Sequence, residues 1–354
     1  MSSILFYDPA CRDPYDTRTL RDRAMGGTEA SVTRVADALG AYVMQHNRTE
    51  AFGAYVPPGR IAGIEHVVLI RDSRALPLVK DLFPHACVYL WIHDQLSPGS
   101  KRGRWLASTA SLLREMSVTL VCVSDSQRRG VEATLQRMQV EEQVRACTIY
   151  NPVADELAPD ETPVDHNKLV FFSSPNKGLS FTLDAFRALR RGIPDLYLCV
   201  GNPGYKPGEP TDIEGVKWLG PLPQERMHAQ VRSAFCTFIP NFVIPETFGL
   251  VFAESRAVGT PVLTADCGAA LEVLGDPAQV VPVTGAQRAY ETALGGLPAR
   301  WRSGPARVAA RVGLFDSYVE RISAWRSGGR PRTGPDPRFG LTAVLAQWHA
   351  LLAL

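Results

Sequence analysis

Residues 240–262 read PNFVIPETFGLVFAESRAVGTPV, and this stretch decides the fold. Pro245 ends an extended segment, and Thr247 carries a side chain that can cap the first turn of a helix. Gly249 allows a ligand to approach the backbone of that turn closely. A helix that begins at Thr247 would present free amides, which form a ready site for an anion such as a phosphate.

Two glutamates flank this predicted helix start. Glu254 lies seven residues after Thr247, which at about 100° per residue returns it to the same face, roughly 10 Å farther along the axis. Glu254 would then accept hydrogen bonds from ribose hydroxyls, with Glu246 near the group attached beyond the phosphates. The diphosphate itself would bind at the amides of the first turn, which belong to Phe248, Gly249 and Leu250.

A solvated helix whose glutamates serve only solubility is the alternative interpretation of this segment. The neighbours of Glu254 argue against it, because Phe252, Ala253, Ala257 and Val258 are too apolar for an exposed helix.

This string resembles the Glu-x7-Glu signature of retaining nucleotide-sugar glycosyltransferases with the GT-B architecture, above all glycosyltransferase family 4 (glycosyl transferases group 1). The segments Phe-Gly-Leu and Gly-Thr-Pro-Val make the resemblance specific. It implies an α/β fold in which two Rossmann-like doubly wound domains face each other across a cleft. It also implies a C-terminal helix that returns to the N-terminal domain.

The composition agrees with a globular enzyme of two domains. Of its 354 residues 45% are hydrophobic and 21% charged, and the formal net charge of +2 does not favour nucleic-acid binding. The seven cysteines are scattered without a Cys-x-x-Cys pair, which is typical of a reducing compartment. Because no signal peptide and no run of about 18 apolar residues occurs, we expect a cytoplasmic enzyme.

Short apolar runs alternate with helical patterns in both halves, which predicts two parallel sheets. The expected strands are residues 4–7, 67–70, 87–92, 120–123 and 148–150, then 169–172, 196–200, 216–219, 236–239, 261–264 and 280–283. With the resemblance, we predict an N-terminal acceptor-side domain over 1–153, a linker over 154–167, a nucleotide-sugar donor domain over 168–330 and a C-terminal helix over 337–354.

Two polar segments of the first half are candidate binding residues. Gly26 and Gly27 open a helical pattern and allow a phosphate or sugar to approach, although a Gly-Gly turn alone is more often plain punctuation. His93 and Asp94 follow the apolar run 87–92, where the carboxyl end of a parallel strand can face a binding site. A lone histidine there is usually a structural group. The resemblance implies that the glycines form the donor loop, that His93 contacts the donor sugar or the reaction centre, and that Asp94 contacts the acceptor.

Residues 173–179, Ser-Ser-Pro-Asn-Lys-Gly-Leu, resemble the family loop in which a lysine before a glycine binds the donor diphosphate. The resemblance therefore makes Lys177 the cationic catalyst. Many relatives carry an arginine five or six positions earlier, where this chain has Phe171 and Phe172. Lys206, or an arginine of the first half, is the candidate replacement.

The chain contains no Asp-x-Asp pair, so we expect no metal and no cofactor beyond the nucleotide-sugar co-substrate. Charge neutralisation would then depend on Lys177 and backbone amides. Neither Gly-x-x-x-x-Gly-Lys-Ser/Thr nor Gly-x-Gly-x-x-Gly occurs, which removes the usual arguments for an NTPase or a dinucleotide oxidoreductase.

The resemblance implies transfer of a sugar, with retention, from a nucleoside diphosphate to a hydroxyl of a glycan, glycolipid or metabolite acceptor. No carboxylate pair identifies itself as nucleophile and acid, which favours departure and attack on the same face of the sugar. A nucleotide-sugar epimerase or hydrolase is one alternative. A non-catalytic nucleotide-sugar or glycan-binding relative is another, and the missing arginine argues for it. The arginine-rich residues 327–336 leave open a contact with the inner face of a membrane, although a solvated linker is the simpler interpretation.

Overall fold

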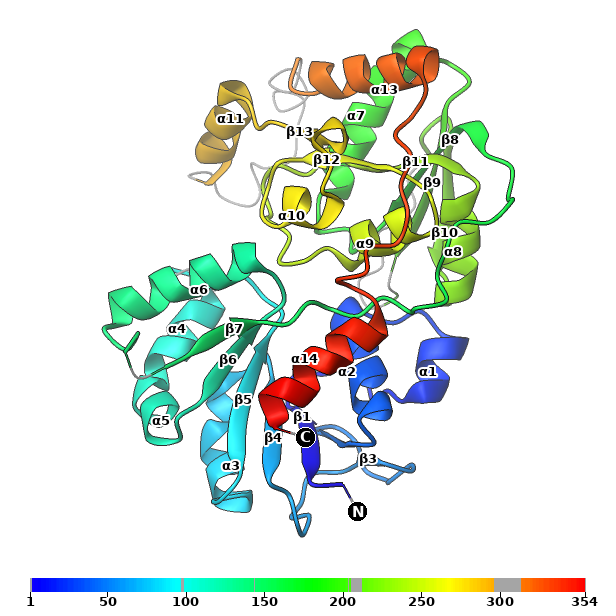
Figure 1. The fold of residues 1–354 in the computed structure, drawn as a ribbon. Coiled ribbons are helices and arrows are strands. Elements are labelled where there is room, and N and C mark those ends of the chain that lie inside the picture. The colour runs from blue at the N-terminus through cyan, green and yellow to red at the C-terminus, as the bar shows by residue number, and fades with distance from the viewer. Residues whose placement is uncertain are drawn as a thin grey trace. The chain divides into compact units, whose positions relative to one another are not determined.

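The computed structural model describes residues 2–96, 99–142, 144–202, 204, 212–295 and 313–353, with the backbone alone over 291–295. The chain divides into two compact units, which Figure 1 shows. Unit 1 consists of Met1–Asp155 and Asp336–Leu354, and unit 2 of Glu156–Pro335.

A seven-stranded parallel sheet forms the centre of unit 1, in the order β3-β2-β1-β4-β5-β6-β7. The strand order reverses between β1 and β4, and such a switch point is where doubly wound sheets bind ligands beyond the carboxyl ends of their strands. The strands are β1 (Ile4–Asp8), β2 (Tyr42–Gln45), β3 (Tyr55–Val56), β4 (His66–Ile70), β5 (Cys87–Ile92), β6 (Thr119–Cys122) and β7 (Ala146–Thr148).

Helices connect these strands and bury their apolar faces against the sheet, as parallel pairing requires. Strand residues such as Leu5, Val67 and Leu120 are fully buried in this core. The helices are α1 (Thr17–Asp22), α2 (Gly27–Ala38), η1 (Ser73–Ala75), α3 (Leu76–Leu82), α4 (Lys101–Ser108), α5 (Ala110–Glu115), α6 (Asp125–Met138) and α14 (Leu341–Leu352).

Unit 2 repeats the same topology in a six-stranded parallel sheet of the order β10-β9-β8-β11-β12-β13. Its switch point lies between β8 and β11, so the loops that follow these two strands are the expected ligand loops. The strands are β8 (Asp165–Phe172), β9 (Tyr197–Asn202), β10 (Val216–Pro221), β11 (Ala234–Ile239), β12 (Val262–Ala265) and β13 (Val280–Val281).

The described helices of unit 2 again lie between its strands and after the last of them. They are α7 (Leu179–Gly192), α8 (Gln224–Arg232), α9 (Leu250–Ala257), α10 (Ala270–Leu274), η2 (Pro277–Gln279), α11 (Gly285–Gly295) and α13 (Asp316–Gly328).

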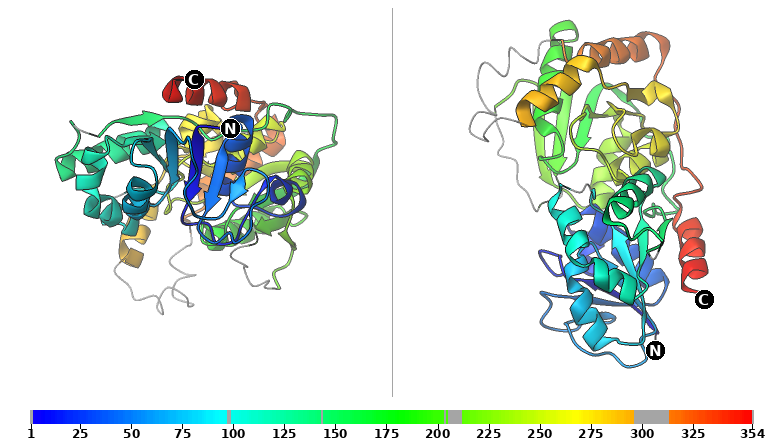
Figure 2. Two further views of the ribbon diagram at one scale, coloured as in Figure 1. Left: turned by 90° about the horizontal axis from the view of Figure 1, so that it is seen from below. Right: turned by 90° about the vertical axis from the view of Figure 1, so that its left-hand side faces the viewer.

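The final helix, α14, belongs to unit 1, where Figure 2 shows it near the amino-terminal strands. Trp348 is fully buried, and its ring centroid lies 5.8 Å from that of Phe6 and 5.0 Å from that of Trp91. The start of the helix is tied down as well, because the Val153 amide donates to the Phe339 carbonyl at 2.7 Å and Asp155 accepts from the Thr342 amide at 3.0 Å.

The predicted fold class is confirmed, with two Rossmann-like doubly wound units and a last helix that returns to the first. Strands β2 and β3 were not among the expected ones, because they have only four and two residues. The boundary between the units falls between Asp155 and Glu156, and β8 already includes Asp165 to Asn167, which lie in the predicted linker of 154–167.

Replacement of Trp348 by alanine should destabilise unit 1 by about 3–5 kcal/mol, because the lost ring leaves a cavity between Phe6 and Trp91. The measurement is urea unfolding followed by far-UV circular dichroism. His349→Ala, an exposed neighbour on the same helix, is the control and should change the free energy of unfolding by less than about 0.5 kcal/mol. Equal effects of the two substitutions would contradict the packing described here.

Candidate functional site

The carboxyl ends of β8 and β11 in unit 2 bring together the predicted lysine and the first predicted glutamate. The Nζ atom of Lys177 lies 2.8 Å from the Oε2 atom of Glu246. The lysine side chain is 39% exposed and that of the glutamate is 7% exposed, so the pair sits at the edge of the buried region. Lys177 therefore presents a cation to solvent while it compensates a buried carboxylate.

Gly178 allows the loop of Lys177 to approach the loop that follows β11. Its φ of 97° lies in the left-handed region, and a Cβ atom there would lie 2.8 Å from the Cβ atom of Asn241. Asn241 in turn folds its own loop, since its Oδ1 accepts from the amides of Val243 and Ile244 at 3.1 and 3.2 Å. Only glycine meets both requirements at position 178.

The backbone of Glu246 is fixed by the loop that follows β12. Its carbonyl accepts from the Ala269 amide at 2.9 Å, and Glu246 forms a parallel bridge with Gly268. A Cβ atom on Gly268 would lie 2.3 Å from the Glu246 carbonyl oxygen, which no side chain allows. The position of the Glu246 carboxylate is thus set by contacts on both sides of its loop.

Helix α9 begins at Leu250, so the predicted start at Thr247 with a threonine cap is wrong. The N-cap residue is Gly249, which has a φ of 85° and forms no side-chain cap. A Cβ atom there would lie 2.6 Å from the Phe252 ring, which explains why a glycine rather than a threonine starts the helix. The amides that lack a preceding helical carbonyl are therefore those of Gly249, Leu250 and Val251, and Phe248 precedes the helix.

Glu254 lies one turn into α9 and is 5% exposed. The Nε2 atom of Gln224, on α8, donates to its Oε1 atom at 2.6 Å. The Nε2 atom of His228, also on α8, lies 3.6 Å from its Oε2 atom. A buried carboxylate requires such partners, so Glu254 is a built feature and not a solvated surface residue.

Phe171 and Phe172 occupy the positions where the family resemblance would place an arginine. Both are buried in the core of unit 2, and a Cβ atom on Gly201 would meet the Phe172 ring at 2.3 Å. No cation can replace them without loss of this packing. Lys206, the predicted substitute, lies outside the described residues.

In unit 1, Gly26 is the N-cap of α2 and Gly27 its first residue. Glu29, in the first turn, has its Oε1 atom 3.5 Å from the Nη1 atom of Arg71. Arg71 follows β4 and has a φ of 64°. This backbone conformation is uncommon for residues other than glycine and asparagine, and it often marks a functional position.

His93 and Asp94 follow β5 as predicted and differ in exposure. His93 is 9% exposed, and burial, followed by the charge of Arg71, holds the pKa of its imidazole well below the usual value. His93 is therefore neutral at pH 7 and suited to hydrogen bonding. Asp94 has a side chain that is 42% exposed, and its Oδ2 atom lies 3.0 Å from the Nε atom of Arg102.

Several residues at these two switch points were missed by the sequence analysis. In unit 1 Asp8 ends β1, accepts from the Tyr15 hydroxyl at 3.0 Å, and has a pKa raised by burial. The carboxyl-end rule could have found both Asp8 and Arg71, since each follows an apolar run that was recognised. Gln224 and His228 gave no comparable signal, because an i, i+4 pair on a polar helix is ordinary.

The described part of the chain shows no other obvious ligand site. Within it, no group of three or more His, Cys, Asp or Glu side chains could hold a metal ion. None of its helices combines the length and hydropathy needed to span a bilayer.

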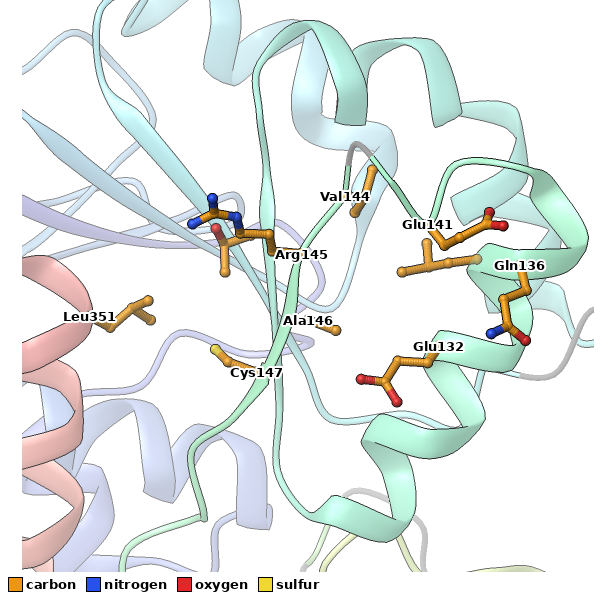
Figure 3. Close-up of a pocket in the computed structure, with 10 residues that line it drawn as sticks. Glu132, Gln136, Glu141, Val144, Arg145, Ala146, Cys147 and Leu351 are labelled. Carbon is orange, nitrogen blue, oxygen red and sulfur yellow. The ribbon is translucent and has the colours of Figure 1, made fainter.

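A cavity of about 520 Å³ lies beside the edge strand β7 in unit 1 and contains none of the predicted site residues (Figure 3). Glu132, Glu141 and Arg145 line it together with Leu351, and this mixed lining indicates no ligand class.

Comparison with known proteins shows what unit 2 is similar to. Residues 166–296 match the family model described as glycosyl transferases group 1. A phosphatidyl-myo-inositol mannosyltransferase of Mycobacterium leprae is 31% identical over 109 residues, which are 30% of this chain and 29% of the relative. A D-inositol 3-phosphate glycosyltransferase of Nocardia farcinica is 40% identical over 85 residues, 24% of this chain and 18% of the relative. The chain thus matches less than a third of the length of either curated relative.

The crystal structure of Anabaena HepE in complex with UDP-glucose shares the fold, with a TM-score of 0.63 and 15% sequence identity over 99% of this chain and 100% of that chain. Residues 166–296, within unit 2, are thus similar to the glycosyl transferases group 1.

Proposed function

We propose that the protein transfers a sugar from a nucleoside diphosphate to a hydroxyl of a glycan, glycolipid or small-molecule acceptor, with retention and without a metal ion. The observation that carries this proposal is the Lys177–Glu246 pair at the switch point of unit 2, with Glu254 on the helix that follows. All three residues lie within the segment that matches the family.

We assign each candidate site residue of unit 2 a role from its surroundings. Glu254 would accept from ribose hydroxyls, because its carboxylate is already oriented by α8. The amides of Gly249 and Leu250, at the start of α9, would donate to the diphosphate together with the Lys177 ammonium group. Glu246 would contact the sugar that is transferred, since its backbone is held rigidly beside Lys177.

Unit 1 would provide the acceptor side of the reaction. We assign His93 and Asp94 to hydroxyl contacts, because they follow β5, the strand next to β4, and combine a neutral imidazole with a half-exposed carboxylate. Gly26 and Gly27 would allow a phosphate or sugar to approach the backbone closely at the start of α2. The names of the two curated relatives make phosphatidyl-myo-inositol and D-inositol 3-phosphate the first acceptors to test.

A contact with an anionic membrane, expected from residues 327–336, receives little support from the arginines there. Arg330 donates to the carbonyl oxygens of Ala234 and Phe235, both at 2.8 Å, and is therefore part of the fold of unit 2. Such a contact would depend on Arg332, which is exposed.

A non-catalytic nucleotide-sugar binding protein is the second candidate, and the buried Phe171 and Phe172 favour it. With Lys177 as the single cation identified near Glu246 in the described chain, leaving-group stabilisation would be weaker than with two cations. Tight binding of a nucleotide sugar without turnover against any acceptor would support this second candidate.

Lys177→Ala should lower kcat by about 10²- to 10³-fold, because the departing diphosphate loses its cationic partner. The measurement is release of nucleoside diphosphate from the donor in the presence of acceptor. Lys217→Ala, which removes an exposed cation of the same unit, is the matched control and should leave the rate unchanged. Near-normal turnover of Lys177→Ala would contradict the assignment of Lys177 as the cation that stabilises the departing diphosphate.

Glu254→Ala should abolish the stabilisation that a nucleoside diphosphate gives to the wild-type protein. At 100 times its dissociation constant a ligand adds about 2.7 kcal/mol to stability. A thermal-shift panel of UDP, GDP, ADP and their sugars, with and without EDTA, measures this effect, and Glu225→Gln on the surface of α8 serves as control. A shift that EDTA removes would contradict the metal-free site.

The product should keep the anomeric configuration of the donor, and no sugar should become attached to Glu246, because the leaving phosphate takes the acceptor proton on the same face. Proton NMR of the product gives the configuration, and intact-protein mass spectrometry with a 2-fluoro sugar donor detects an adduct. An adduct on Glu246 would show a double-displacement reaction instead.

A further inference from the structure

Helix α8 turns two polar side chains toward the carboxylate of Glu254. Gln224 and His228 are four residues apart, so they lie on the same face of the helix. Gln224 donates to the Oε1 atom of Glu254 at 2.6 Å. This contact orients the carboxylate and makes Gln224 a positioning residue.

The imidazole of His228 is the less common feature of this face. Its side chain is 12% exposed, and its Nε2 atom is buried without a hydrogen-bond partner among the described residues. The Oε2 atom of Glu254, 3.6 Å away, is too distant for a good hydrogen bond. A buried nitrogen of this kind costs free energy unless a ligand or water satisfies it.

A hydroxyl group could satisfy both of these atoms. A hydroxyl has one hydrogen to donate and two lone pairs to accept, whereas a carboxylate only accepts and an imidazole N–H donates. An oxygen placed at about 2.8 Å from both atoms would donate to Glu254 and accept from His228. Such a pair of contacts distinguishes a hydroxyl from a hydrogen, a methyl group or a carbonyl.

We propose that His228 is a ribose-binding residue, whose Nε2–H donates to a ribose hydroxyl that itself donates to Glu254. The inference rests on the proposed function, in which Glu254 holds the ribose of the nucleotide. It adds a residue that sets preference for a ribonucleotide over a deoxyribonucleotide. His228 contacts neither the diphosphate nor the transferred sugar, so it acts on donor affinity and not on the chemical step.

The test is isothermal titration calorimetry of wild type and His228 variants with UDP, GDP and ADP and with their 2′-deoxy and 3′-deoxy counterparts. His228→Ala should weaken the ribonucleotide that binds by about 2- to 12-fold, the range for one neutral hydrogen bond. It should leave unchanged the affinity for the deoxynucleotide that lacks the contacted hydroxyl. His228→Gln, whose amide nitrogen can replace the Nε2 atom, should restore most of the preference.

Two controls separate this role from a purely structural one. Arg226→Gln, on the exposed face of α8, should affect neither nucleotide, and thermal unfolding without ligand checks that each variant is folded. In the transferase assay, His228→Ala should raise the KM for the donor with kcat unchanged.

Equal weakening of ribonucleotide and deoxynucleotide by His228→Ala would overturn the inference, as would no effect on either. These results are distinct from failure of the proposed function, in which the wild-type protein would bind no nucleoside diphosphate at all.

Discussion

The loops at the carboxyl end of the sheet of unit 2 depend on how closely the backbone of Glu246 approaches Gly268. The Glu246 carbonyl accepts from the Ala269 amide at 2.9 Å, and this contact leaves no space for a side chain at position 268. Close contacts join the loops that follow β8, β11 and β12. Lys177, after β8, therefore meets the carboxylate of a glutamate whose backbone is held in place. The parallel sheet places these loops at the same edge, and the close contact fixes how far apart they lie.

The Lys177–Glu246 pair also couples two functions that are usually considered separately. Glu246 is almost fully buried, so removal of the lysine would leave a charged carboxylate without compensation. A bound diphosphate would compete with Glu246 for the same ammonium group. Under the proposed function, the strength of the pair would therefore influence both the stability of the empty protein and its affinity for the donor. Such an exchange of partners would suit a site in which the described residues supply one cation near Glu246.

The sequence predicted the fold class well because both its signals are local. Strands β5 and β11 are long apolar runs, and the glycines and glutamates of residues 246–254 mark a ligand loop. The helix start was placed three residues too early, since a threonine was preferred as cap over a glycine whose left-handed conformation is dictated by Phe252. Periodicity alone could not find β3, which has two residues. It also could not find the contacts of Gln224 and His228 with Glu254. Those contacts join segments about 30 residues apart, and only the folded backbone brings them together.

The return of α14 to unit 1 means that unit 2 is inserted, as one continuous segment, into a domain encoded in two pieces. Trp348, which fills the space beside Phe6 and Trp91, is translated after every residue of unit 2. During synthesis, part of the aromatic core of the first 155 residues therefore stays uncovered until α14 is made. By then all the described strands of unit 2 have been translated. The order in which the ribosome releases the chain thus favours completion of unit 2 first, and leaves an apolar surface of unit 1 for chaperones to protect until the last helix is released.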